Sequence, residues 1–286
     1  MTQQSLFKKS VATLIGFLLI ISLMLCFAPN NDANADEIIW EQIDYEKHFK
    51  KEITDAGNLY GGTIKELTYI KKYRYLYVFI VGSGGMGGKS ENNVGYGGGA
   101  GGFAAVKIDL KVAQNLIIVL GKGGGKVEFD ESDSQQTGDG FLSTVSILNA
   151  PTETMPISMD VIVIGGGKLS SNNLPGEGGK VDRGTPKYQL MKLLYSQSGA
   201  DGGQASHSFS VDLGFRTEHF IYRPMGAYPS GKGGGASVFH RGGDGGVMFK
   251  NGSDGLMGAG GGGAGKGASQ GGFGGDAYME VYGSNM

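Results

Sequence analysis

The stretch that decides the fold is residues 82–102, GSGGMGGKSENNVGYGGGAGG, in which 11 of 21 positions are glycine. Residues 231–246 and 252–275 have the same character, with 8 glycines in 16 positions and 13 in 24. Glycine loses more backbone entropy on folding than any other residue, roughly 0.5–1 kcal/mol relative to alanine. Such tracts therefore either stay disordered or pack in a way that only a missing side chain allows.

The sequence between the glycine tracts favours an ordered chain. Residues 75–81, 115–120 and 159–164 are short apolar runs rich in β-branched and aromatic residues, as buried strands are. Residues 103–110 and 277–282 alternate, which is typical of strands buried on one face. Disordered segments rarely carry this much apolar surface. We therefore expect an all-β fold.

Ordered glycine tracts can form extended left-handed helices with three residues per turn, related to polyproline II. Without Cβ atoms, neighbouring helices approach closely enough for backbone N–H and C=O groups to pair between them. Collagen follows a related logic but needs a strict Gly-X-Y repeat, which is absent here. We predict a β-sandwich-like body that carries polyglycine II-type helices and loops.

We predict a signal peptide at 1–35, an N-terminal segment at 36–72 and a glycine-rich β domain at 73–286, with an insert at about 180–230. In the N-terminal segment, Tyr60-Gly61-Gly62 predicts a turn. In the insert, Thr185 as N-cap, a following proline and a terminal Gly199 predict one short α-helix over Pro186–Gln197.

Residues 1–35 have the three zones of an export signal. Lys8 and Lys9 precede the apolar run 11–28, and a polar segment then ends in Ala-Asn-Ala. We predict cleavage between Ala35 and Asp36. The apolar run is also just long enough to cross a bilayer, so an anchor that is retained is the alternative. The expected destination is secretion, the cell surface, or the periplasm and outer envelope.

Two motifs bear on cofactors. Residues 82–87 match the dinucleotide fingerprint GxGxxG, but the fingerprint needs a helix directly after it, and the glycine-rich sequence that follows cannot form one. Residues 271–279 match the calcium nonapeptide GGxGxDxUx, although one copy supplies only half a site. We expect no cofactor and no metal, with Asp276 and the acidic loop 128–139 as the calcium candidates.

Aromatic residues punctuate the glycine tracts, where they either seal the edges of a glycine core or form exposed contacts. Rigid aromatic side chains among glycine and serine make effective recognition surfaces. The candidates are Tyr96, Phe103, Phe239, Phe273 and Tyr278. The sequence has no GxSxG or HExxH motif and no nucleophilic cysteine in the mature chain, so we expect a protein that is not an enzyme.

The order of motifs resembles a known family. YLYVFIVGSGG at 75–85, YGGGAGGFAAVKIDL at 96–110, NLIIVLGKGGG at 115–125, GDGFLSTV at 138–145, VIVIGGGK at 161–168 and GGFGGDAYMEVYG at 271–283 carry the resemblance. It is to the glycine-rich domains of bacterial surface proteins and phage tail-fibre tips, and to a similar region outside receptor tyrosine kinases of the anaplastic lymphoma kinase type. This resemblance covers roughly residues 60–168 and 231–283 and implies recognition or adhesion.

We therefore expect an exported, non-enzymatic scaffold for surface recognition or adhesion. Its partner would be a cell-surface or envelope protein or a glycan, and it would meet a membrane only through the export signal. The formal net charge of −2 and the lack of a basic cluster argue against nucleic acid. A structural subunit of a secretion or pilus assembly and an exported enzyme with an unrecognised site stay as alternatives, and self-association is left open.

Overall fold

The computed structural model describes residues 39–89, 94–126, 138–149, 158–171, 174–184 and 190–286. They belong to one compact unit, Ile38–Met286, and the predicted signal peptide and its cleavage site lie outside the described residues. Within the described part, no helix is long and apolar enough to cross a membrane.

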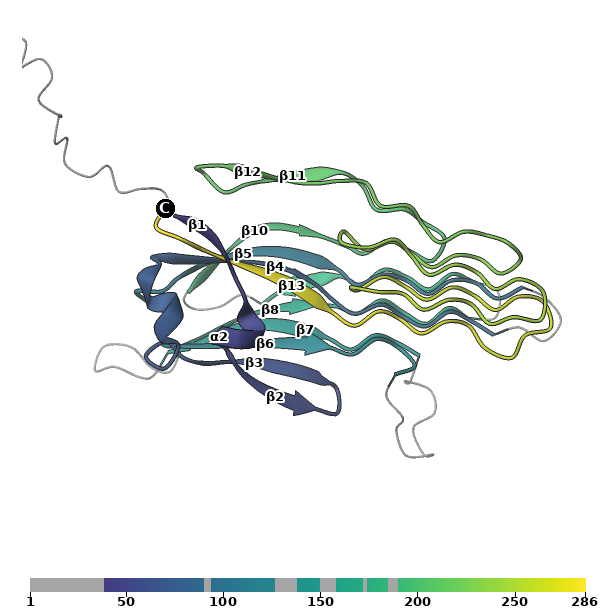
Figure 1. Cartoon of the computed structure of the whole chain (residues 1–286), viewed down its shortest axis with the longest axis horizontal. Helices are drawn as coiled ribbons and strands as arrows, with labels where there is room; N and C mark the ends of the chain where they lie inside the picture. Colours follow the sequence, from purple (N-terminus) through teal and green to yellow (C-terminus); the bar gives the residue numbers. More distant parts are fainter. Residues whose placement is uncertain (1–38, 90–93, 127–137, 150–157, 172–173, 185–189) are drawn as a thin grey trace, which may run out of the picture. The chain divides into compact units, whose positions relative to one another are not determined.

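Two antiparallel sheets form the body, with a separate hairpin beside them (Figure 1). The first sheet has five strands in the order β1-β13-β4-β5-β10, and the second has six in the order β2-β3-β6-β7-β8-β9. The first sheet comprises β1 (Trp40–Ile43), β13 (Tyr278–Ser284), β4 (Tyr75–Val81), β5 (Phe103–Asp109) and β10 (Met191–Gln197). The second comprises β2 (Lys50–Thr54), β3 (Gly57–Thr63), β6 (Asn115–Gly121), β7 (Ser143–Asn149), β8 (Ser158–Ile164) and β9 (Val181–Arg183), and the hairpin is β11 (Phe209–Asp212) with β12 (Thr217–Phe220). The predicted all-β fold is confirmed.

Strand β4 shows why its sequence is apolar without a break. Alternate side chains of a strand point to opposite faces. Leu76, Val78 and Ile80 join the core that is shared with the second sheet, whereas Tyr77 and Phe79 join a second core on the other face. Because both faces are covered, no position on β4 calls for a polar residue.

The second core is aromatic and lies between the first sheet and the β11–β12 hairpin. Phe103 contacts Phe220 with ring centroids 4.9 Å apart, and Tyr195 stacks on Phe209 at 4.5 Å. Such aromatic pairs contribute roughly 0.5–1.5 kcal/mol beyond the area they bury. This core attaches the hairpin to the sandwich.

Two sequence predictions of local structure are wrong. Residues 190–197 are the described part of the predicted helix, and Met191–Gln197 is strand β10, which pairs with β5 from Met191↔Ile108 to Gln197↔Phe103. The helix signals are local preferences of the sequence. Pairing with the edge of the first sheet, which buries Met191, outweighs them. Tyr60–Gly62 is not a turn but the middle of β3, where a Cβ atom on Gly61 would lie only 2.3 Å from the Leu116 carbonyl oxygen.

The regular helices among the described residues are short. Helix α2 covers Tyr45–His48, with the Asp44 side chain accepting the Lys47 N–H as an N-cap, and the 3₁₀ helix η1 covers Thr68–Lys72. Both belong to the predicted N-terminal segment. Residues 39–72 also supply β1 to the first sheet and β2 and β3 to the second, so this segment is part of the sandwich.

Candidate functional site in the glycine bundle

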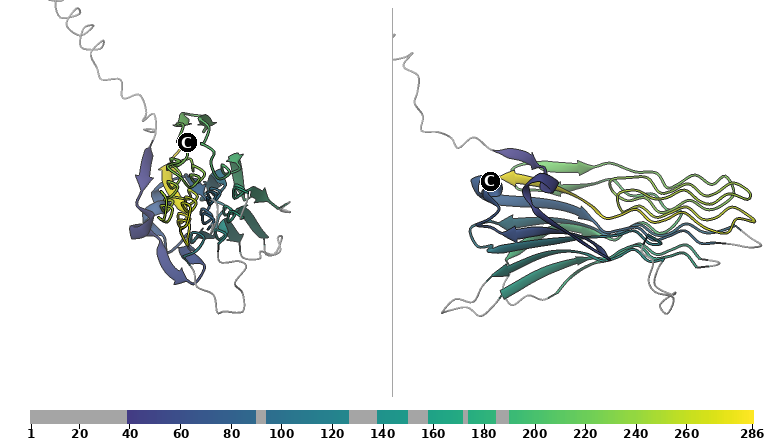
Figure 2. Two further views of the ribbon diagram at one scale, coloured as in Figure 1. Left: turned by 90° about the vertical axis from the view of Figure 1, so that its right-hand side faces the viewer. Right: turned by 60° about the horizontal axis from the view of Figure 1, so that its bottom comes forward.

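The glycine tracts continue from the strand ends as extended segments that run side by side (Figures 1 and 2). Gly95, Gly98 and Gly101 donate their N–H groups to the carbonyls of Ala264, Gly261 and Gly258, at 2.8, 2.9 and 2.8 Å. Both sides of this ladder advance by three residues, in opposite directions. A repeat of three is that of a polyproline II-type helix, so the two tracts pack as antiparallel polyglycine II-type helices.

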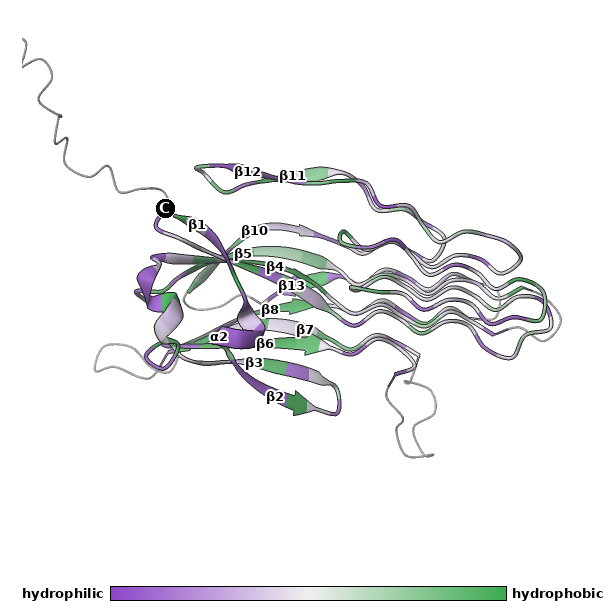
Figure 3. Cartoon of the chain, in the orientation of Figure 1, coloured by the Kyte–Doolittle hydropathy of each residue, from purple (hydrophilic) through white to green (hydrophobic). Residues whose placement is uncertain are grey.

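Segment 258–265 lies at the centre of this glycine bundle. Every backbone group that faces a neighbour there can find a partner, because glycine carries no Cβ atom to hold the helices apart. Segment 258–265 exchanges backbone hydrogen bonds with 82–88, 95–101, 232–235, 243–246, 250–253 and 272–275. The bundle is therefore a three-dimensional hydrogen-bonded array rather than a sheet. Figure 3 shows it as largely pale, against the green of the buried strands.

This packing requires residues that have no Cβ atom. A Cβ on Gly260 would lie 2.0 Å from the Gly98 carbonyl oxygen, and one on Gly84 would lie 2.0 Å from that of Ala259. Real Cβ contacts are essentially never this close. Ala100 and Ala264, by contrast, are fully buried at positions that accept a methyl group. The predicted glycine helices are therefore present, with alanine only where space allows it.

The Asp276 carboxylate contacts a backbone N–H group and a lysine side chain. Its Oδ1 accepts the Gly123 N–H at 2.8 Å and lies 3.3 Å from the Lys126 ammonium group. Among the described residues, no group of three or more histidine, cysteine, aspartate or glutamate side chains is placed to hold a metal ion. Residues 128–137 of the acidic loop lie outside the described residues, and Asp139 accepts the Leu169 N–H and pairs with Lys168. Asp276 thus acts as a backbone cap and an ion-pair partner.

The predicted contact aromatics differ in how far they are buried. Phe103 is 1% exposed and inside the second core, which rules it out as a contact residue, and Phe239 packs on Tyr278 at 5.0 Å beside it. Tyr96 and Phe273 are half-buried within the glycine bundle. The structure brings Phe103, Phe239 and Tyr278 together at the base of the bundle, away from its far end.

Apolar side chains are exposed on the turns at the end of the bundle that lies away from the sheets. The sequence patterns did not predict this exposure. We call residues 89, 228–232, 247–250 and 266–270 the distal tip. Val247, Met248 and Phe249 are 49%, 55% and 69% exposed there. The missed signal was three consecutive apolar residues between two glycine tracts, a place where polar turn residues are the rule.

Backbone hydrogen bonds fix the conformation of the tip. Phe249 donates its N–H to the Lys266 carbonyl at 2.9 Å, and Gly265 donates to the Lys250 carbonyl at 3.0 Å. Phe249 has a φ of 61°, a left-handed conformation that bulky side chains rarely adopt. A phenylalanine that is strained and mostly exposed adds little to stability, which points to a role outside folding.

Two other surfaces carry exposed side chains. Tyr222, Met225 and Tyr228 are 57%, 38% and 45% exposed, and their spacing of three places them on one ridge of an extended helix. A groove of about 540 Å³ lies where the bundle leaves the second sheet. Its lining includes Lys168, which the Asp139 carboxylate already neutralises at 2.8 Å.

The chain matches a known family over most of its length. The model of a family described as a glycine-rich domain matches residues 61–285, a range that holds the bundle and all the strands from β4 to β13. The chain belongs to this glycine-rich domain family. No curated protein matches the chain. The matched range includes residues 180–230, which hold β10 and the β11–β12 hairpin.

Proposed function

We propose that this glycine-rich domain protein is an exported, non-enzymatic recognition scaffold that adheres to an envelope or cell-surface partner through its distal tip. The observation that carries the proposal is the exposure of Val247, Met248 and Phe249 on turns that backbone hydrogen bonds hold in place. A contact surface fixed in advance loses less entropy on binding than a flexible one. The bundle supports this role by holding the tip at a distance from the sandwich.

Export is part of the same proposal. Lys8 and Lys9, the apolar run 11–28 and the Ala-Asn-Ala sequence before Asp36 support a cleaved signal. The mature chain should begin at Asp36, and mass spectrometry of protein purified from producing cells measures this directly. A mass that retains residues 1–35 would instead favour the membrane-anchored form.

Binding to envelope fragments from the host organism tests the recognition role. Phe249→Asn removes the exposed ring, while Val112→Ser changes a residue that is 47% exposed at the opposite end of the sandwich. We expect Phe249→Asn to weaken binding at least tenfold and Val112→Ser to leave it unchanged. Equal binding by both variants, or a protein that surface labelling of intact cells cannot reach, would contradict the proposal.

The Tyr222–Met225–Tyr228 ridge favours the second candidate, a structural subunit of an envelope assembly. A continuous exposed ridge along the side of the bundle suits lateral packing against another exported protein. In that case Tyr222→Ser with Met225→Ser would abolish assembly, and Phe249→Asn would have no effect. The two candidates are therefore separated by whether binding depends on Phe249 or on the pair Tyr222 and Met225.

A further inference from the structure

We infer that the distal tip binds the surface of a lipid bilayer that carries anionic headgroups. This inference rests on the proposed function, since it names the class of partner that the tip recognises. It also goes beyond the sequence expectation that only the export signal meets a membrane. Two observations combine to support it: the chemistry of the exposed apolar side chains and the charge that surrounds them.

The apolar part consists of three neighbouring side chains that are about half exposed or more, with the Phe249 ring lying against Gly267. Val247, Met248 and Phe249 are consecutive, and the Lys250 N–H closes their turn on the Val247 carbonyl at 2.9 Å. Apolar side chains of this kind enter the boundary between headgroups and acyl chains when a protein lies on a membrane. Phe249 has a φ of 61° and is 69% exposed, so its strained conformation is kept at a residue that buries little of its surface.

The charged part is basic. Lys89, Lys250 and Lys266 are exposed at the tip, and Lys232 lies 5.4 Å from the centroid of the Tyr228 ring. The described residues of the tip include no acidic side chain. The whole chain has a formal net charge of −2, so this end differs in sign from the molecule.

Basic residues around a small apolar patch match an anionic membrane surface. Each lysine near such a surface contributes about a fivefold gain in affinity. The long lysine side chains can reach the headgroups while the apolar side chains sit deeper. A protein partner would more often present an apolar groove with a polar rim, and a glycan would meet flat, polar surfaces rather than a protruding valine, methionine and phenylalanine. The partner that fits the tip best is therefore a lipid surface.

The test uses the full chain purified from producing cells and vesicles of equal parts phosphatidylglycerol and phosphatidylcholine. Co-sedimentation should give a Kd that Phe249→Asn weakens at least tenfold. Asparagine tolerates the left-handed conformation, so this variant keeps the fold and its melting temperature. Lys250→Gln with Lys266→Gln should weaken binding about 25-fold to these vesicles and have little effect with phosphatidylcholine alone.

A position-specific probe removes any contribution from an N-terminal anchor. In a Cys26→Ser background, Met248→Cys carries an environment-sensitive dye at the tip, and Lys111→Cys carries it at the opposite end. The dye should shift to shorter wavelength on the vesicles at 248 and not at 111. A shift at 111 alone, or binding that is unaffected by Phe249→Asn, would overturn the inference.

The outcomes also separate this inference from the proposed function. If the protein ignores the vesicles while Phe249→Asn still abolishes binding to envelope fragments, the tip recognises a protein or glycan, and the lipid inference fails alone. If Phe249→Asn changes neither binding to vesicles nor binding to envelope fragments, both fail.

Discussion

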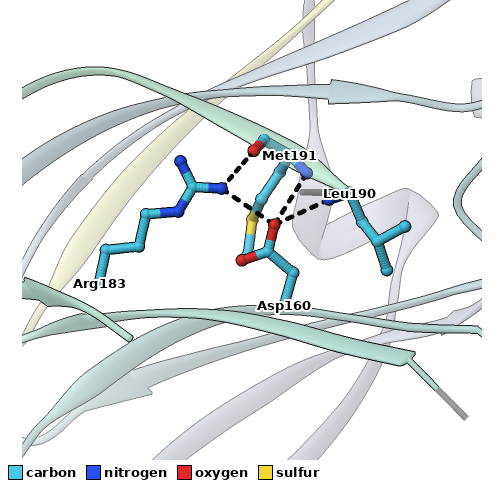
Figure 4. Close-up of polar contacts among 4 residues, drawn as sticks. All are labelled: Asp160, Arg183, Leu190 and Met191. Atoms are coloured by element: carbon cyan, nitrogen blue, oxygen red, sulfur yellow. Dashed lines mark hydrogen bonds and ion pairs between the residues drawn. The ribbon is translucent and has the colours of Figure 1, made fainter. Parts of the chain in front are cut away.

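Asp160 on β8 and Arg183 on β9 form a buried ion pair within the second sheet, with Arg183 Nη2 donating to Asp160 Oδ2 at 3.1 Å (Figure 4). The same carboxylate oxygen accepts the backbone N–H groups of Leu190 and Met191 at 2.9 and 3.1 Å. Asp160 lies on β8 of the second sheet, and Met191 begins β10 of the first. The pair therefore helps to explain why the chain enters β10 as a strand rather than as the helix that its local sequence predicts.

Removing the Asp160 carboxylate should lower the free energy of unfolding substantially. Asp160→Ala leaves the Arg183 charge, which is only 18% exposed, and two backbone N–H groups without their acceptor. We expect a loss of roughly 3–5 kcal/mol in the free energy of unfolding, measured by urea denaturation. Asp182→Ala, at the exposed neighbouring position of β9, is the control and should change stability by less than about 0.5 kcal/mol. Similar values for the two variants would contradict the assigned role of Asp160.

Glycine positions in the bundle should differ sharply in what they tolerate. Gly260→Ala places a Cβ 2.0 Å from the Gly98 carbonyl oxygen, so the backbone must move, at a cost of roughly 1–3 kcal/mol in the free energy of unfolding. Gly184→Ala meets no atom within 4 Å and should stabilise the protein by roughly 0.4–1 kcal/mol through the unfolded chain. Thermal melts of the two variants make the comparison. Equal melting temperatures would show that the tract at 258–265 is loose.

The two ends of the bundle should respond differently to loss of an aromatic ring. Phe103→Ala empties a site in the second core and should destabilise the protein by roughly 3–5 kcal/mol. Phe249→Asn removes a ring that is 69% exposed and relieves an unfavourable φ, so stability should hold or rise. Denaturation curves of both variants test this contrast. A destabilised Phe249→Asn would mean that the tip aromatic serves folding.

Stability should depend on Glu41 at low pH. A hydrogen bond from Lys72, then those from Tyr69 and Tyr73, lower the pKa of the Glu41 carboxyl from 4.5 to about 2. Because the pKa is lower in the folded state, the ionised group stabilises the fold above about pH 4.5, and this contribution is lost as the pH falls towards 2.

The variant Glu41→Gln measures this contribution. The native protein should melt at a higher temperature than the variant at neutral pH, and the gap should close between about pH 4.5 and 2. Adding Tyr73→Phe to Glu41→Gln should cause little further change in the pH dependence, since the Tyr73 hydroxyl donates to this carboxylate at 2.6 Å. A gap that is constant with pH would contradict the assigned network.

The body of the fold could be predicted from the sequence because its strands carry their own signals. Residues 75–81 are predicted as a strand and form β4, and 115–120 and 159–164 fall within β6 and β8. Each is a mainly apolar run followed directly by glycine, a pattern that needs no distant partner to be recognised. The glycine helices follow from composition, since only glycine permits backbone groups of neighbouring helices to meet.

Other features depend on contacts that a single sequence does not display. Strand β10 is decided by the edge of β5 and by Asp160, 31 residues before Met191. Strand β3 runs through Gly61 and Gly62 because its partner β6 is paired residue by residue with it. The distal tip could not be predicted because nothing in the sequence says which turns face away from the sheets. The aromatic candidates were chosen by residue type alone. Phe103 is buried in the structure, so it is not available for contact with a partner.

Backbone amide exchange measures the central claim most directly, since the glycine tracts form a rigid bundle only if they are hydrogen-bonded to one another. The N–H groups of Gly260 and Gly263 donate to Gly235 and Lys232, and Gly261 donates to Gly85. We predict that these amides exchange as slowly as those of strand β4. Exchange at the rate of a free peptide across 82–88, 95–102 and 258–265 would contradict the bundle and the recognition role built on it.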